Sequence, residues 1–152
     1  MNQRTIKQEA TLKGIGLHTG KEVTLTFKDI KKLLSGEESK EYKNRFTIKV
    51  GQHLKMISVN DIECFYSENK ATYIYTSDGR NYLLETSLEN LESQLNPKYF
   101  FRISRKYFIN IKAINDIISY TNSRLKIKLN SYKEQDLIVS RERVKAFKEW
   151  LN

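Results

Sequence analysis

The chain has 152 residues, of which 39% are hydrophobic and 30% are charged, so it has room for one domain of ordinary size plus an appendage. One proline and six glycines argue against a disordered or fibrous protein. No run approaches the roughly 18 apolar residues of a membrane span, and the first residues do not resemble a signal peptide. The single cysteine, Cys64, excludes an intramolecular disulfide, and its apolar neighbours favour a buried structural thiol. We therefore expect a soluble, cytoplasmic protein.

Positive charge is concentrated in the last third of the chain. The formal net charge is +9, and residues 98–152 alone hold thirteen Lys or Arg against five Asp or Glu. Residues 43–97, in contrast, hold six basic and seven acidic residues. This asymmetry favours a polyanionic partner, most simply nucleic acid, although a Lys-rich surface that only maintains solubility is the alternative.

The first 42 residues are predicted to be separate from the rest. Over residues 1–28, the strand-like runs "RTIKQEATLKGIG" and "EVTLTF" flank a turn at "LHTGK" and predict a β-hairpin. Residues 29–42 predict a short helical segment followed by a polar linker. The main domain is therefore expected over residues 43–152.

Residues 44–87 have the pattern of short, closely spaced β-strands. In "RFTIKV", Phe46, Ile48 and Val50 alternate with polar neighbours, as expected for a strand with one buried face. The dipeptide Asp78-Gly79 predicts a hairpin between two further strands. The predicted strands of this part cover residues 45–50, 53–59, 62–67, 72–77 and 81–87.

Two amphipathic segments are predicted to be helices. The first follows Ser87, a candidate N-cap, has three leucines on one face, and ends at Pro97. The second closes the chain over residues 141–151, with Ser140 as its candidate N-cap. Strands are predicted between the helices over residues 107–111, 114–120, 124–130 and 136–140. The fold class is therefore mostly β, an antiparallel β-sheet domain with one internal helix and a C-terminal helix, preceded by the hairpin.

The stretch "FFRISRKYFINI", residues 100–111, combines clustered cations with apolar and aromatic residues. Arg102, Arg105 and Lys106 stand within five positions. One interpretation is a core strand with a few solvated charges, and the other is a rigid platform that holds cations against an anion. We favour the platform, because apolar anchors would present Arg105 and Lys106 with few degrees of freedom, and Arg suits bidentate contact with guanine or phosphate.

Cations also stand at the start of the predicted closing helix. Arg141 and Arg143 oppose the helix dipole there, and Glu142 offsets them only in part, so an anionic partner is expected at this position. Lys126 and Lys128, in contrast, lie on the polar face of a predicted strand, where we expect them to be solvated.

Three stretches together resemble the LytTR family of bacterial DNA-binding domains over about residues 43–152. They are "VNDIECFYSENKATYIYTSDGRNYLLETSLENLESQL", "FFRISRKYFINIKAI" and "LIVSRERVKAF", and the second is the most specific. The resemblance implies a mostly β domain whose loops, rather than a recognition helix, enter double-stranded DNA. It also implies transcription regulation, without a cofactor, by dimers or paired monomers on direct repeats near promoters.

The resemblance implies three groups of DNA-contacting residues. The positions that match the family's contacting loops are Asn69, Lys70, Thr72 and Tyr73; Ser104, Arg105 and Lys106; and Ser140, Arg141 and Arg143. Many members have His at the position of Ser104, and often near Thr72. At these two positions this chain differs from those members, and the difference concerns the particular bases that are contacted. No catalytic residue, metal site or small-molecule substrate is implied.

Residues 1–28 resemble a different family. With "GIGLHTG" as the most specific part, they are similar to the N-terminal hairpin of the zinc-dependent UDP-3-O-acyl-N-acetylglucosamine deacetylase. Activity is not expected, because His18 and His53 are the only histidines and do not have the spacing of a three-ligand zinc site. A remnant, a fusion and an assembly junction remain open as origins of this segment.

Control by phosphorylation is not expected from this chain. Most relatives carry a receiver domain, and "KDIKKLLSGEESKEY" resembles the end of its linker helix, but nothing upstream supplies the acceptor Asp.

Besides DNA binding and an inactive deacetylase-related fragment, a third hypothesis is a cationic module for a protein or membrane surface. It ranks below DNA because no lipid-facing amphipathic helix with a basic polar face is present.

Overall fold

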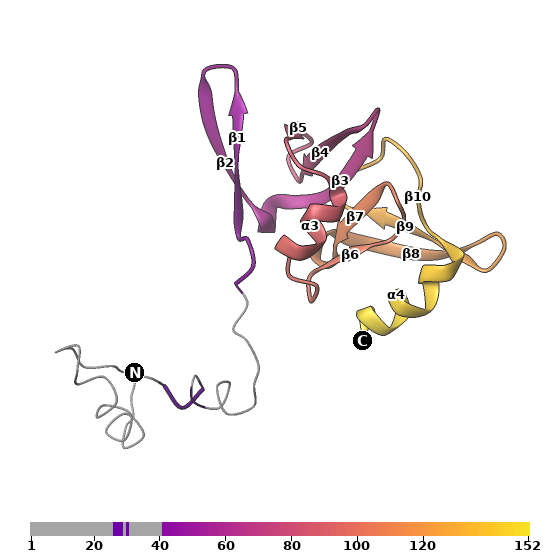
Figure 1. The fold of residues 1–152 in the computed structure, drawn as a ribbon. Helices are drawn as coiled ribbons and strands as arrows, with labels where there is room; N and C mark the ends of the chain where they lie inside the picture. The colour runs from indigo at the N-terminus through magenta and orange to yellow at the C-terminus, as the bar shows by residue number, and fades with distance from the viewer. Residues whose placement is uncertain (1–25, 29, 31–40) are drawn as a thin grey trace. The chain divides into compact units, whose positions relative to one another are not determined.

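The computed structural model describes residues 26–28, 30 and 41–152. Residues 42–152 form one compact unit (Figure 1). Residues 1–25 of the predicted hairpin and most of the linker predicted over residues 29–42 lie outside the described residues, as do the "GIGLHTG" motif and His18. Phe27, the last residue of the strand-like run "EVTLTF", is helical rather than extended. Among the described residues, no helix has the length and apolar character needed to cross a membrane.

Antiparallel strands are the predominant elements of the compact unit, which confirms the predicted mostly β class. The strands are β1 (Arg45–Val50), β2 (His53–Ser58), β3 (Ile62–Glu68), β4 (Ala71–Thr76), β5 (Asn81–Leu84), β6 (Phe100–Arg102), β7 (Tyr107–Asn110), β8 (Ile114–Tyr120), β9 (Arg124–Leu129) and β10 (Leu137–Val139). They form a two-stranded sheet β1-β2, a five-stranded sheet β5-β4-β3-β7-β6 and a three-stranded sheet β10-β9-β8. The two predicted helices are present as α3 (Leu88–Gln94) and α4 (Val144–Leu151).

The five-stranded sheet is covered on both faces, because its central strand β3 buries side chains on both sides. Phe65 and its neighbour Cys64 are both fully buried, yet adjacent residues of a strand point to opposite faces. Two separate apolar clusters therefore form, one on each face of this sheet. α3 belongs to one cluster and α4 to the other, and Figure 1 shows the two helices on different sides of the sheet.

On the first face, α3 and the β1–β2 hairpin pack against the sheet. Leu91 of α3 is fully buried, and so is Ile74 of β4. The cluster consists of Phe46, Ile48, Ile57, Ile62, Phe65, Ile74, Tyr82, Leu88, Leu91, Leu95, Phe100 and Phe108. Burial of this apolar surface is the main force that holds α3 and the base of the hairpin in place.

On the second face, the three-stranded sheet and α4 cover a cluster rich in tyrosine. Its members are Cys64, Tyr66, Tyr75, Ile103, Tyr107, Ile109, Ala113, Ile127, Leu129, Tyr132, Leu137, Val139 and Phe147. The Cys64 thiol is buried, as predicted, and this burial raises its pKa. The buried carboxylate of Glu63 accepts hydrogen bonds from the amides of Ser131 (3.0 Å) and Tyr132 (3.0 Å), which fixes the β9–β10 connection.

Two hairpin turns join β3 to β4 and β4 to β5. The Asp78-Gly79 hairpin is confirmed, and Gly79 has a φ of +84°, a conformation that favours glycine. The central residues of the β3–β4 turn are Asn69 (φ 50°) and Lys70 (φ 65°). Two consecutive positive φ values are typical of the turn type whose twist matches a two-residue hairpin.

Three features of the secondary structure differ from the predictions. The strand predicted over 81–87 ends at Leu84, and the short strand β6 was not predicted, because three residues are too few to show a periodic pattern. The closing helix begins with a 3-10 turn, Arg141–Arg143, and becomes α-helical only at Val144.

Candidate nucleic-acid interface

The three predicted contact stretches lie at the same end of the five-stranded sheet. The turn after β3 is next to the start of β7, because Tyr66 pairs with Tyr107. The amide of Ser140 donates to the carbonyl of Ile103 (3.0 Å), which brings the start of the closing helix to the β6–β7 connection. We call residues 69–73, 103–106 and 140–143 together the loop end.

The β6–β7 connection, residues 103–106, is fixed at both ends. Its first residue, Ile103, is fully buried. The residue that follows the connection, Tyr107 at the start of β7, is also buried. The carbonyl of Lys106 accepts from the amide of Ser67 (2.9 Å), and the amide of Lys106 donates to Ser104 Oγ (3.3 Å). Arg105 and Lys106 are exposed on this constrained backbone. The geometry thus has the features expected of a platform rather than of a regular strand with solvated charges.

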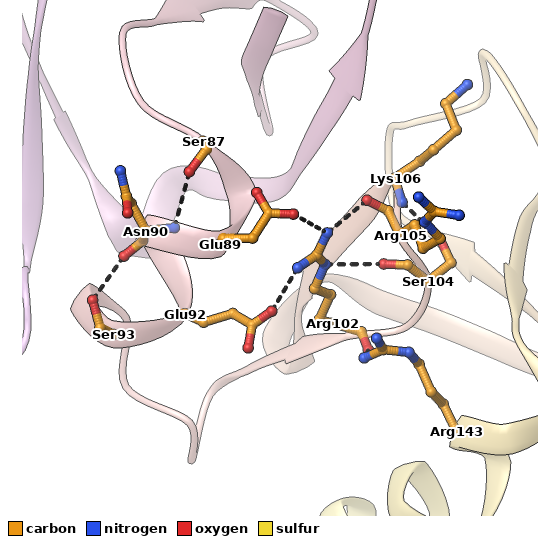
Figure 2. A network of polar contacts seen from close by, with 10 residues as sticks. All are labelled: Ser87, Glu89, Asn90, Glu92, Ser93, Arg102, Ser104, Arg105, Lys106 and Arg143. Atoms are coloured by element: carbon orange, nitrogen blue, oxygen red, sulfur yellow. Dashed lines mark hydrogen bonds and ion pairs between the residues drawn. The ribbon is translucent and has the colours of Figure 1, made fainter. Parts of the chain in front are cut away.

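Arg102 braces this connection from below, as Figure 2 shows. Its Nε donates to the carbonyl of Ser104 (3.2 Å), and its Nη2 donates to the carbonyl of Arg105 (2.8 Å). The same guanidinium contacts Glu92 Oε1 through Nη1 (2.6 Å) and Glu89 Oε1 through Nη2 (3.0 Å). Only 11% of the Arg102 side chain is exposed. Arg102 is therefore a positioning residue that ties the connection to α3.

The charge of Arg102 is compensated within the protein. Burial alone would lower the pKa of Arg102, but the hydrogen bonds from its guanidinium to Glu92 and Glu89 raise it. Glu89 has a lowered pKa in return, first because its carboxylate accepts from its own backbone amide and then because of Arg102. This network holds a permanent cation in a partly buried position.

α3 places the two carboxylates that hold Arg102. The hydroxyl of Ser87 accepts from the amide of Asn90 (3.1 Å), so Ser87 is the N-cap that its sequence position predicts. Residues three apart lie on the same helix face, so Glu89 and Glu92 both reach Arg102.

The start of the closing helix differs from its prediction. Ser140 stands at the N-cap position, but its side chain makes no capping hydrogen bond and instead donates to the carbonyl of Ile103 (3.4 Å). Arg143 is half-buried, and its Nη1 donates to the carbonyl of Arg102 (3.0 Å), whereas Arg141 is exposed. Ser140 and Arg143 therefore help to assemble the loop end, and Arg141 is more accessible to a ligand.

Residues 69–73 do not all face the same way. Asn69 and Lys70 are exposed at the tip of the hairpin. Thr72 is only 5% exposed and lines a hollow together with Lys70 and Arg105. Tyr73 points to the opposite face, where its ring stacks on Tyr66 with the centroids 5.2 Å apart. Lys70 and Arg105 thus border one depression, with Thr72 set deeper in it.

The exposed cations of the loop end lack acidic partners among the described residues. The ion pairs within this part of the chain involve Arg80, Arg102 and Lys126, and none of them involves Lys70, Arg105, Lys106 or Arg141. Such a group of uncompensated cations on fixed turns can bind an extended anion.

Sequence reasoning missed the role of Arg102 and part of the role of Lys126. Arg102 was grouped with its exposed neighbours, although Glu89 and Glu92 at helical spacing were a signal for an internal cation partner. Lys126 was expected to be solvated, but its Nζ lies 3.1 Å from Asp136 Oδ1. Lys128 is exposed, as predicted.

Comparisons with known proteins agree with this architecture. Residues 52–152 match the family described as LytTr DNA-binding domain. The chain is 28% identical over 94 residues to the transcriptional regulatory protein YpdB of Escherichia coli K12, an alignment that covers 62% of this chain and 38% of YpdB. It is 30% identical over 118 residues to the transcriptional regulatory protein LytR of Staphylococcus aureus N315, covering 76% of this chain and 46% of LytR. The chain thus spans less than half the length of these curated relatives.

A solved structure has a similar fold. The LytTr DNA-binding domain of a putative methyl-accepting/DNA response regulator from Bacillus cereus superimposes with a TM-score of 0.64 at 20% identity, covering 72% of this chain and 98% of that one. At this identity the similarity concerns the fold, whereas the family match covers about two thirds of the sequence. The chain belongs to the LytTr DNA-binding domain family.

Proposed function

We propose that the chain binds double-stranded DNA through the loop end and regulates transcription. The observation that carries the proposal is a group of cations at one end of the sheet that form no ion pair with any residue the structure describes: Lys70, Arg105, Lys106 and Arg141. Family membership and the names of the curated relatives, which are transcriptional regulatory proteins, support DNA as the anion.

The proposed mechanism is insertion of fixed loops into DNA grooves. The planar guanidinium of Arg105 suits bidentate contact with the O6 and N7 atoms of guanine, or with a phosphate. Lys106 and Lys70 are flexible point charges, which suit the phosphate backbone and set the register on the duplex. Because Arg102 and the buried neighbours already fix the backbone of residues 103–106, little loop entropy is lost on binding.

The remaining predicted contacts have narrower roles in this proposal. Asn69 and Ser104 offer neutral hydrogen-bonding groups beside the cations, and Arg141 adds a charge from the start of the closing helix. Thr72, Tyr73, Ser140 and Arg143 act mainly by shaping the loop end. We expect two copies to bind together on direct repeats, as the family resemblance implies, and no cofactor to take part.

Selection of bound duplexes from a random pool, followed by fluorescence anisotropy across a salt series, tests the proposal. If about six phosphates are neutralised, the logarithm of affinity falls against the logarithm of salt concentration with a slope of about −5. Enrichment of a repeated motif supports sequence-specific binding. Binding that does not depend on salt, or stronger retention on anionic vesicles than on competing duplex DNA, would contradict it.

A further inference from the structure

A second basic hollow adjoins the loop end on the side of the three-stranded sheet. It lies between the turn that joins β8 to β9 and the start of the closing helix. Its lining residues are Asn122, Arg124, Ile138, Ser140, Arg141 and Glu142. Two of them, Ser140 and Arg141, belong to the loop end, so the hollow continues that surface.

Arg124 is held in a defined orientation at the edge of this hollow. Its Nε donates to the carbonyl of Thr121 (3.0 Å), and its Nη2 donates to Thr121 Oγ1 (2.9 Å). The guanidinium also lies over the ring of Tyr120, 5.1 Å from the centroid. These hydrogen bonds use two of the five N–H donors of a guanidinium, which leaves donors for a ligand. Arg124 is thus oriented in advance while donors remain available.

The turn itself brings a polar side chain to the same hollow. Asn122 (φ 57°) and Ser123 (φ 60°) both have left-handed backbone conformations, which Asn adopts more readily than most residues. Asn122 is exposed and lines the hollow, where its amide NH₂ can donate. Among the described residues that line the hollow, Glu142 is the one carboxylate, against the two guanidinium groups of Arg124 and Arg141. No ion pair among the described residues compensates either arginine.

We propose that this hollow binds a phosphate group of the DNA backbone outside the bases that the loop end contacts. Arg124 and Arg141 bind the phosphodiester from two sides, and the amide of Asn122 donates a further hydrogen bond. The inference rests on the proposed DNA binding and extends its footprint to the β8–β9 turn, a segment outside the three predicted contact stretches. A phosphate is the ligand because its negative charge attracts the guanidinium groups and its several oxygens can accept from their N–H donors.

Salt-dependent binding of Arg124→Gln to the selected duplex tests the inference. We expect a salt slope that is shallower by about 1, and an affinity that falls about fivefold to tenfold at about 0.1 M salt for specific and unrelated duplexes alike. The matched control is Arg80→Gln, which removes the same charge in the β4–β5 turn, at the opposite end of β4 from the loop end. The control should keep the wild-type slope.

A second variant guards against a purely structural effect of losing Arg124. Asn122→Asp keeps a residue that tolerates the left-handed turn and adds a carboxylate to the hollow, so it should also weaken binding to all duplexes. A wild-type slope for both Arg124→Gln and Asn122→Asp, with folding verified by thermal unfolding, would overturn the inference. If the wild type itself shows no salt-dependent DNA binding, the proposed function fails instead, so the two failures are distinguishable.

Discussion

The two ends of the five-stranded sheet both carry arginine in a turn, but they use it differently. In the β4–β5 turn, Arg80 Nε lies 3.7 Å from Asp78 Oδ2, and the Asp78 carboxylate also accepts from the hydroxyl of Thr76. At the loop end, Arg105 and Lys106 have no such acidic partner among the described residues. A binding surface is therefore better located by which cations lack a partner than by where cations are numerous.

The loop end repeats this contrast within four residues. Arg102 is the last residue of β6 and Arg105 lies in the connection that follows it, yet the first is almost fully covered and bonded to two carboxylates, and the second is exposed. The compensated arginine holds the carbonyl groups of the backbone that carries the uncompensated one. Structural and ligand-binding cations thus depend on each other, and substitutions can separate their roles.

Replacement of Arg102 should have the largest effect. Arg102→Ala removes the donors to the carbonyl groups of Ser104 and Arg105, so we expect the free energy of unfolding to fall by about 1–3 kcal/mol. Specific DNA affinity should fall too, because the 103–106 backbone loses its brace. Urea unfolding and anisotropy measure the two effects. An unchanged free energy of unfolding would show that Arg102 is not a positioning residue.

Replacement of Arg105 should separate binding from stability. Arg105→Ala is expected to weaken specific binding by about 1–3 kcal/mol and to relax the preference at one base position. Its free energy of unfolding should stay within about 0.5 kcal/mol of the wild type, since the side chain is exposed. Arg80→Ala is the control, with little change in binding. If Arg105→Ala and Arg80→Ala lowered the specific affinity equally, the proposed difference between the loop end and the β4–β5 turn would be contradicted.

The sequence was sufficient to predict the fold class, the two helices and most strands, because alternation and helical spacing are local properties. Ser87 was identified as an N-cap from such a local pattern, and it does cap α3. Strand β6, in contrast, has only three residues, so its assignment depends on pairing with β7 rather than on its own pattern.

The candidate site was predictable as a set of segments but not as a set of roles. Arg102 and Arg105 have the same local chemistry, and only the tertiary position of Glu89 and Glu92 distinguishes them. Ser140 likewise has the sequence features of a cap, but the nearby carbonyl of Ile103 attracts its hydroxyl. Long-range contacts of this kind are not visible in residue spacing.

Replacement of Lys70 should change binding and stability in opposite directions. Lys70 has a φ of 65°, which costs an ordinary residue roughly 1–2 kcal/mol and glycine almost nothing. Lys70→Gly should therefore raise the free energy of unfolding by about 0.5–1 kcal/mol, net of the entropy that glycine loses, and should weaken DNA binding through the lost charge. Lys70→Ala, as control, should weaken binding without the gain in stability. A loss of stability in Lys70→Gly would contradict the assigned strain.

The smallest effect is expected in the acid titration of one carboxylate at each end of the sheet. Glu89 has a pKa below its ordinary value of 4.5, owing to its own backbone amide and then to Arg102, and Asp78 has one below 3.8, owing chiefly to Thr76. Because both pKa values are lowered in the folded state, the stability they contribute is present above those ordinary values and is lost as the pH falls through the lowered ones.

Carboxyl-carbon NMR titration of the wild type and of Arg102→Ala can assign these shifts. In Arg102→Ala, the pKa of Glu89 should rise part of the way toward 4.5, because the backbone amide still donates to the carboxylate. The pKa of Asp78 should not move, since Thr76 lies at the other end of β4 from the loop end. A shift of both carboxylates would mean that the two ends are electrostatically coupled, whereas a shift of Glu89 alone confirms that the partners of Arg102 act only at the loop end.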